Sequence, residues 1–234
     1  MLFNSIDFVI FLTIVFILYW FVVSKKLKLQ NLLIVCVSYF FYAWWSWKFL
    51  SLIIFSTILD YSVGIWIYKT NKQLNRKILL TISIIFNLGV LCFFKYYNFF
   101  VDSFVNTFSF LGYEFGGAHL NIILPVGISF YTFQTLSYSI DVYKRKLEPT
   151  KDFITFTAFV SFFPQLVAGP IERASNLLPQ FYKKRIFSHQ NATDGLRQIL
   201  WGMFKKVVIA DNCSEYANLF FEQPDNYSGG ALFL

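Results

Sequence analysis

Long apolar runs separated by short basic loops dominate the pattern of this chain. A helix needs about 20 mostly apolar residues to cross the hydrocarbon core of a membrane. The runs that approach this length are 6–23, 29–45, 49–68, 78–94 and 120–140. A further run covers 153–171, and a shorter one at 196–210 carries three basic residues. The pattern therefore predicts an all-α polytopic membrane protein.

Composition excludes a soluble domain. The 234 residues are 56% hydrophobic and 14% charged, whereas soluble domains carry about 25% charged residues. Asp7 precedes the first run where a secretory signal would be basic, so we expect a retained helix. The net charge of +7 does not indicate a nucleic-acid partner, because the basic residues lie between apolar runs. The expected surroundings are membrane lipid.

The basic loops predict an orientation. Loops 24–28, 69–77 and 141–152 each hold three or four Lys or Arg residues, whereas the intervening loops at 46–48 and 95–119 hold one each. Short loops rich in Lys and Arg stay in the cytoplasm. Because the basic loops alternate with the others, they fall on one side. The N-terminus is therefore predicted to lie outside.

The stretch FFPQLVAGPIER, residues 162–173, breaks the pattern. It is apolar, yet it contains Pro164, Gly169 and Pro170, which interrupt helices. Residues 173–185 are as basic as loop 141–152, so both flanks of the run are predicted to be cytoplasmic. We expect a re-entrant segment that enters and leaves on one side. An ordinary spanning helix remains the alternative, since the run is long enough to cross.

Polar side chains inside the runs are the candidate site. Asp60 lies in the middle of run 49–68, where a carboxylate needs a partner or a wet cavity. It is either a polar site facing the bundle interior or a hydrogen-bonded link to a neighbouring helix. Tyr131, Gln134, Thr135 and Tyr138 share one helix face. That stripe could line a polar tunnel or join two helices.

The remaining candidate chemistry is weak. His119 lies in a predicted external loop, and His189 opens HQNATD, a His-x4-Asp pattern found in some acyltransferases. The same loop fits a helix start capped by Ser188 or Thr193. Cysteines inside apolar runs, such as Cys36, are predicted to be small core residues. We expect no metal site and no bound cofactor.

Three segments carry a family resemblance. In chain order they are LPVGISFYTFQTLSYSIDVYK, FFPQLVAGPIER and GMFKKVVIAD. They resemble the membrane-bound O-acyltransferase (MBOAT) family, in the branch of the bacterial alginate O-acetylation protein. The start of the chain and SYFFYAWW are similar to the same branch. The likeness covers essentially the whole chain.

The resemblance implies a fold and an activity. The fold would be a ring of helices around a thin, funnel-like core, and residues 1–234 would be the N-terminal portion of that single transmembrane domain, incomplete at the C-terminus. The enzyme would lie in the bacterial inner membrane. It would take an acyl group, acetyl in this branch, from acetyl-CoA or another acyl carrier. The acceptor would be an extracellular or periplasmic polysaccharide such as alginate, and an extracytoplasmic acetyltransferase partner would complete the transfer.

The resemblance also assigns candidate residues. The family's catalytic histidine lies in a later region, and neither His119 nor His189 matches its motif, so no catalytic residue is expected in this chain. Glu172 and Arg173 could pair with each other or bind anionic groups of the acyl donor. The substrate-binding or tunnel-lining candidates are Tyr131, Gln134, Tyr138, Gln165, Glu172, Arg173, Lys205 and Lys206.

Other functions stay open at this point. Peptidoglycan O-acetylation and D-alanylation of teichoic acid occur in the same family. Broken helices with polar residues at mid-membrane also occur in small-molecule transporters. A remnant or scaffold without catalytic activity is a further alternative. The genes beside this one would separate these readings.

Overall fold

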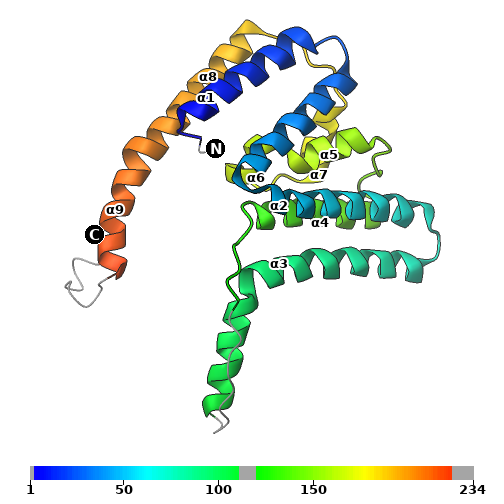
Figure 1. Ribbon diagram of the computed structural model, residues 1–234. Coiled ribbons are helices and arrows are strands. Elements are labelled where there is room, and N and C mark those ends of the chain that lie inside the picture. Colours follow the sequence, from blue (N-terminus) through cyan, green and yellow to red (C-terminus); the bar gives the residue numbers. More distant parts are fainter. Residues whose placement is uncertain (1–2, 111–119, 223–234) are drawn as a thin grey trace. The chain divides into compact units, whose positions relative to one another are not determined.

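The computed structural model describes residues 3–110 and 120–222, which are helices and connecting loops (Figure 1). They fall into two compact units. Residues 21–184 form the core unit, and residues 1–20 with 185–234 form the terminal unit. In the core unit, α2 (Leu27–Lys69) and α3 (Gln73–Phe110) are each long and apolar enough to cross a membrane. The chain is thus an all-α membrane protein, as predicted.

Helix α2 is two helices joined at a sharp break. Ser46 has an extended backbone, with φ −161° and ψ 113°, inside the long helix. The two halves therefore run in different directions (Figure 1), and they match the predicted runs 29–45 and 49–68. Trp44, Trp45 and Trp47 are exposed around the break, as expected for tryptophans at a membrane interface.

Helix α3 is longer than the sequence predicted. The apolar run ends at 94, but the helix continues to Phe110. Residues 90–110 contain neither Gly nor Pro, so nothing stops the helix where the hydropathy falls. Hydropathy sets the length of a membrane segment, whereas helix breakers set the length of a helix. His119 lies outside the described residues.

Helix α4 (Ile128–Tyr143) begins later than its apolar run. Pro125 and Gly127 prevent helix before it, and Gly127 has a left-handed backbone with φ +74°. A Cβ at Gly127 would lie 2.4 Å from the carbonyl oxygen of Leu166. This glycine therefore allows the start of α4 to touch the backbone of a later segment.

The run 153–171 is broken into short helices. Asp152 caps α5 (Phe153–Ser161) by accepting the N–H of Ile154 at 3.0 Å. Phe162, with φ −53° and ψ 104°, ends α5, and α6 (Phe163–Ala168) follows with a proline in its first turn. The return contains α7 (Ala174–Leu177) and the 3₁₀-helix η2 (Leu178–Phe181). The predicted breakers therefore act where the sequence placed them.

The terminal unit pairs α1 (Ile6–Ile17) with a long C-terminal helix. The π-helical turn η1 (Leu18–Val22) follows α1. The C-terminal helix consists of α8 (His189–Phe204), the π-helix η3 (Lys205–Ala210) and α9 (Asp211–Glu222). Phe187 contacts the rings of Phe16 and Trp20 at 6.1 and 5.6 Å. The predicted run 196–210 is the middle of this longer helix.

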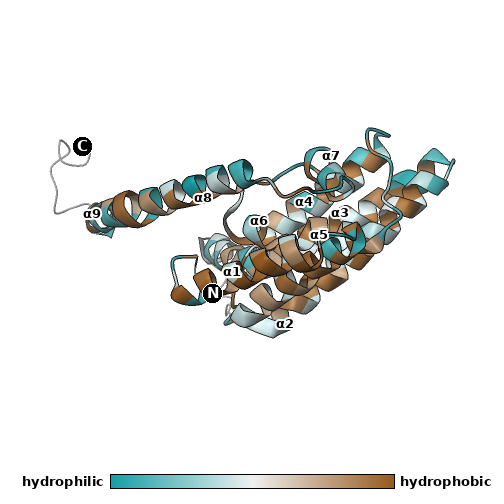
Figure 2. Cartoon of the chain, turned by 90° about the horizontal axis from the view of Figure 1, so that it is seen from above, coloured by the Kyte–Doolittle hydropathy of each residue, from teal (hydrophilic) through white to brown (hydrophobic). Residues whose placement is uncertain are grey.

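Apolar colour predominates along the long helices of the core unit, whereas hydrophilic and hydrophobic residues alternate along α8 (Figure 2). Cys36, Cys92 and Cys213 are all exposed, so the prediction that the cysteines in apolar runs are core residues was wrong. The physical reason is the membrane. Lipid tails are as apolar as leucine, so an apolar run does not tell which of its residues face protein.

Candidate functional site

Asp60 lies at the centre of a buried polar cluster in the core unit. Its side chain is fully buried, although it belongs to the apolar second half of α2. From Asp60 to the end of α2 at Lys69 the helix rises about 13 Å, which is near half the thickness of a membrane core. The sequence left open whether this carboxylate is a polar site facing the bundle interior or a link to a neighbouring helix, and the structure buries it.

Donors from two other helices hold the carboxylate. Ser83 of α3 donates to Oδ1 at 2.5 Å, and Asn87 of α3 donates to Oδ2 at 2.8 Å. Ser139 of α4 donates to Oδ1 at 3.0 Å. Ser56 of α2 closes the group by donating to Asn87 Oδ1 at 2.9 Å. We call these five residues the Asp60 cluster.

The Asp60 cluster can hold a negative charge or a proton. Among the described residues, no Lys or Arg bonds to Asp60, so its acceptor capacity is met by neutral donors. The hydroxyls of Ser83 and Ser139 can rotate and accept, so Oδ1 could take a proton without breaking the cluster. The hydrogen bonds also join α2, α3 and α4, which is the linking role that the sequence left open. Ser83 and Asn87 were missed, although their spacing of four in run 78–94 puts them on one helix face.

The stripe on α4 is buried as predicted and contacts α5. Gln134 donates to the carbonyl oxygen of Phe159 at 2.7 Å. The rings of Tyr138 and Phe156 have centroids 4.6 Å apart. A Cβ on Gly64 would lie 2.7 Å from the Tyr138 ring, so α2 needs a glycine there. Gln134 and Tyr138 thus join helices in this structure.

Two polar atoms near the start of α4 are buried without partners. The Tyr131 hydroxyl and Gln165 Oε1 have no hydrogen bond within the described part of the chain. Gln165 Nε2 donates to the carbonyl of Pro170 at 3.1 Å. The carbonyl oxygen of Leu166, the residue after Gln165, lies against Gly127. Gly127 comes about one helical turn before Tyr131 in the chain. The start of α4 and α6 therefore hold unused hydrogen-bonding capacity, a costly arrangement in an apolar interior.

One asparagine ties the start of the broken run to the return that follows it. Asn31 Nδ2 donates to Thr155 Oγ1 and to the carbonyl of Phe181, each at 3.0 Å. Between Thr155 and Phe181 the chain runs alongside α2, where the N–H of Phe163 donates to Ser38 Oγ at 3.2 Å. From Asn31 to Ser38 the helix rises about 10 Å. The segment thus leaves the level of Asn31, turns and returns to it.

The basic loops of the core unit gather at one end. Gln73 donates to the Tyr143 hydroxyl at 3.0 Å, which joins loop 69–77 to the end of α4. Arg76, also missed from sequence, donates to the Tyr143 carbonyl, and its guanidinium lies 5.1 Å from the Tyr143 ring. The hydroxyls of Thr150 and Tyr182 are hydrogen-bonded, which joins loop 141–152 to the return of the broken run. Burial raises the pKa of Tyr182 to about 12, with Asp152 and Tyr61 adding to the rise.

The charged candidates lie on the surface. Arg173 is exposed and Glu172 is half-buried, and these two described residues form no ion pair with each other. Lys206 is paired with Asp211, and the ammonium of Lys205 lies 5.7 Å from the Trp201 ring. The lysines begin the π-helix η3, a rare form that often marks functional sites and that no sequence pattern revealed.

The His-x4-Asp pattern does not form a pair. His189 is the exposed first residue of α8, and Asp194 is paired with Arg197 at 3.6 Å. Ser188 caps α8 by accepting the N–H of Asn191 at 3.4 Å, as the alternative reading predicted. Across the described residues there is no group of three or more His, Cys, Asp or Glu side chains able to hold a metal ion.

Several known proteins are similar in sequence to most of this chain. It is 38% identical over 206 residues to the probable alginate O-acetylase AlgI of Azotobacter vinelandii, covering 87% of this chain and 41% of that protein. It is 37% identical to the probable AlgI of Pseudomonas aeruginosa, covering 87% and 39%. It is 34% identical over 231 residues to the peptidoglycan O-acetyltransferase of Helicobacter pylori, covering 88% and 43%.

The chain spans about two fifths of the length of these relatives. No protein-family profile matches it, and no solved structure matches it. The matched part includes most of the chain, and with it most of the segments that carry the resemblance. The resemblance to the alginate O-acetylation branch is therefore confirmed, and the chain is a homologue of bacterial proteins named as alginate O-acetylases and peptidoglycan O-acetyltransferases.

Proposed function

We propose that this chain forms part of a membrane-bound O-acyltransferase that passes an acetyl group to a polysaccharide outside the cell membrane. The observation that carries the proposal is the similarity of 34–38% over about 87% of the chain to proteins named for this chemistry. The broken run 153–171 and the buried polar stripe on α4 are structural features that fit this function. The catalytic group of the whole enzyme lies outside the residues named here.

The basic end of the core unit supports an orientation. Loops 69–77 and 141–152 and the return after Phe181 are linked by hydrogen bonds at that end. We place this end in the cytoplasm, the N-terminus outside and the multi-pass chain in the bacterial inner membrane. The acyl donor, acetyl-CoA or another acyl carrier, would then approach the basic end.

The broken run supports a re-entrant segment within a helical ring. Thr155 near its start and Phe181 in the return both bond to Asn31. Phe163 bonds to Ser38, about 10 Å further along α2. The first half of α2 continues to Ser46, about 22 Å from Asn31, so the turn reaches only part of the depth. Irregular backbone at that depth persists where protein buries it or a cavity lines it.

The tip of the re-entrant segment supports a path for the acyl group. Tyr131 offers a hydroxyl and Gln165 an amide oxygen, both buried and without partners. The hydroxyl can donate to the carbonyl oxygen of an acyl group, which carries no charge and suits a narrow apolar passage. Gln134 and Tyr138 fix α5 beside this path. Arg173, next to Glu172 in the chain, could bind phosphate groups of the donor in two-point contact.

The partners follow from the same scheme. The acceptor is a polysaccharide, and several relatives are named for alginate. Peptidoglycan is a second candidate, because one relative is named for it. An extracytoplasmic acetyltransferase would receive the acetyl group and place it on the acceptor.

Deletion of the gene in its own bacterium tests the proposal. We expect O-acetyl groups to fall in the surface polysaccharide and to return when the intact gene is restored. Loss from peptidoglycan instead would select the second acceptor, and loss of D-alanine from teichoic acid would replace acetyl transfer by D-alanylation. Unchanged ester content in all three polymers would contradict the function.

Single substitutions test the residues. Tyr131→Phe removes only the hydroxyl and should lower acetylation about tenfold at equal protein abundance, by loss of one carbonyl contact in the transfer step. Arg173→Ala should raise the donor concentration needed for half-maximal transfer. Lys48→Ala, an equal loss of charge at an exposed site after the Ser46 break, is the control. If Arg173→Ala and Lys48→Ala need the same donor concentration for half-maximal transfer, Arg173 does not bind the donor.

A further inference from the structure

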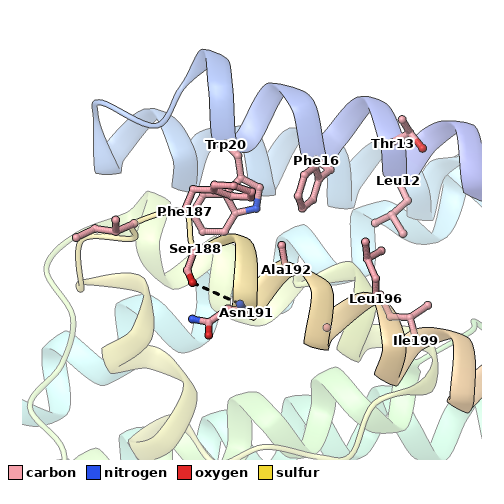
Figure 3. A pocket seen from close by; sticks show the side chains of 12 residues that line it. Leu12, Thr13, Phe16, Trp20, Phe187, Ser188, Asn191, Ala192, Leu196 and Ile199 are labelled. Atoms are coloured by element: carbon pink, nitrogen blue, oxygen red, sulfur yellow. Dashed lines mark hydrogen bonds between the residues drawn. The ribbon is translucent and has the colours of Figure 1, made fainter.

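An apolar groove lies between α1 and the beginning of α8 in the terminal unit (Figure 3). Its volume is about 520 Å³, within the range of small-molecule sites. Leu12 and Phe16 line one wall, and Leu196 and Ile199 line the other. None of these side chains offers a hydrogen bond, so the body of the groove suits a hydrocarbon chain.

Ser188 and Asn191 are the polar residues at one end of the groove, whereas Thr13, beside Leu12, donates its hydroxyl to the Val9 carbonyl at 2.8 Å. Figure 3 shows Ser188 and Asn191 near Trp20, away from Leu12 and Ile199. The N-terminus of α8 lies here, with the positive end of its helix dipole and no acidic residue in its first turn. The acidic side chain of the second turn, Asp194, is paired with Arg197.

Arg185 adds a positive charge at the same end. Its guanidinium lies 5.7 Å from the ring of Tyr19, the neighbour of Trp20. In the sequence, Lys183 and Lys184 precede it, and Lys25 and Lys26 follow the first helix. These four lysines belong to the core unit, so within the terminal unit Arg185 is the basic residue near the polar end of the groove, while Arg197 of α8 is paired with Asp194.

We propose that this groove binds an anionic phospholipid, with one acyl chain between α1 and α8 and the phosphate at the start of α8. An apolar groove closed by a basic, amphipathic end complements such a molecule in both shape and charge. Trp20 lies near the end of the apolar run 6–23, a position at which tryptophans favour lipid headgroups. The residues of the groove belong to the terminal unit and include none of the Asp60 cluster or of the broken run, and the proposal does not depend on acyl transfer.

Two glycines of α8 provide a matched test. A Cβ on Gly195 or on Gly202 meets nothing within 4 Å, so both positions accept a larger side chain. Only Gly195 lines the groove. Gly195→Leu should fill the groove, whereas Gly202→Leu changes the same helix by the same atoms elsewhere.

The measurement is native mass spectrometry of the purified 234-residue chain with phosphatidylglycerol or phosphatidylcholine added. We expect one phosphatidylglycerol retained by the wild type and by Gly202→Leu, and about tenfold weaker binding by Gly195→Leu. Arg185→Gln should lower the preference for phosphatidylglycerol about fivefold, the effect of one basic residue at an anionic lipid surface.

Three results would overturn the proposal. They are equal binding of the two lipids by the wild type, equal binding by the two glycine variants, and no retained lipid. If Gly195→Leu does not fold, a photoactivatable phosphatidylglycerol on the wild type decides. Labelling of residues 12–20 and 186–199 above other helices supports the site. Uniform labelling contradicts it and would mean that another protein segment covers the groove.

Discussion

The two segments that carry motifs, 124–173 in the core unit and 202–211 in the terminal unit, differ in how their polar residues are held. In the first, Gln134 and Tyr138 are almost fully buried and contact neighbouring helices. In the second, α8, η3 and α9 contain no buried residue in the described part of the chain. Segments of similar polarity in the sequence thus differ in the structure: polar residues of the first are buried against neighbouring helices, and those of the second are exposed.

The difference separates two kinds of mutational effect. A buried polar group leaves unsatisfied partners when it is removed, so substitutions in the core unit should change folding. An exposed group exchanges its partner for water or headgroups, so substitutions in α8, η3 and α9 should change stability little. Matched pairs of substitutions, one in each unit, test this comparison.

The largest expected contrast is between two glycines. Gly127→Ala forces a side chain into a left-handed backbone and onto the carbonyl oxygen of Leu166, so it should lower the free energy of unfolding by about 3 kcal/mol. Gly202→Ala adds a methyl group in open space inside a helix and should raise it by about 0.5–1 kcal/mol. Reversible unfolding in mixed detergent micelles measures both. Equal shifts would mean that the start of α4 does not touch α6.

The second contrast is between two aspartates. Asp60→Ala leaves the donors of Ser83, Asn87 and Ser139 without their acceptor. Hydrogen bonds between membrane helices contribute about 0.6 kcal/mol each, so the loss should be roughly 2 kcal/mol. Asp211→Ala breaks an exposed ion pair with Lys206 and should cost at most about 0.5 kcal/mol.

Asp60→Asn sharpens that result. The amide keeps the shape and one acceptor but cannot carry charge. Stability close to the wild type would show that the Asp60 cluster acts as a neutral link. A loss as large as that of Asp60→Ala would show that the cluster requires a carboxylate.

Sequence predicted the membrane class, the break near Ser46 and the interruption of run 153–171, because each depends on local signals. Apolar length marks membrane helices, and Pro and Gly mark where they stop. The end of α3 and the exposure of the cysteines could not be read in this way. Lipid and protein interior select the same apolar residues, so hydropathy does not tell which face is buried.

The candidate site was predictable only where the polar residue was conspicuous. Asp60 was found because a carboxylate is rare in an apolar run, whereas its partners Ser83 and Asn87 are ordinary there. Asn31 was missed because its role depends on two residues more than a hundred positions away. Long-range pairing of this kind needs the packed structure.

The smallest contrast is between two asparagines, and it tests the proposed re-entrant segment most directly. Asn31→Leu removes both hydrogen bonds that hold the ends of that segment and should cost about 1 kcal/mol. Asn212 donates only to Val208 of its own helix, so Asn212→Leu should cost less than about 0.5 kcal/mol. Hydrogen exchange adds a local readout. In Asn31→Leu, amides of residues 174–181 should exchange faster while those of α3 keep their rates, because Asn31 bonds to the return and to α5 but not to α3. Unchanged exchange at 174–181 would mean that Asn31 does not tie the segment, and the turn at Ser38 would then be held by α6 alone.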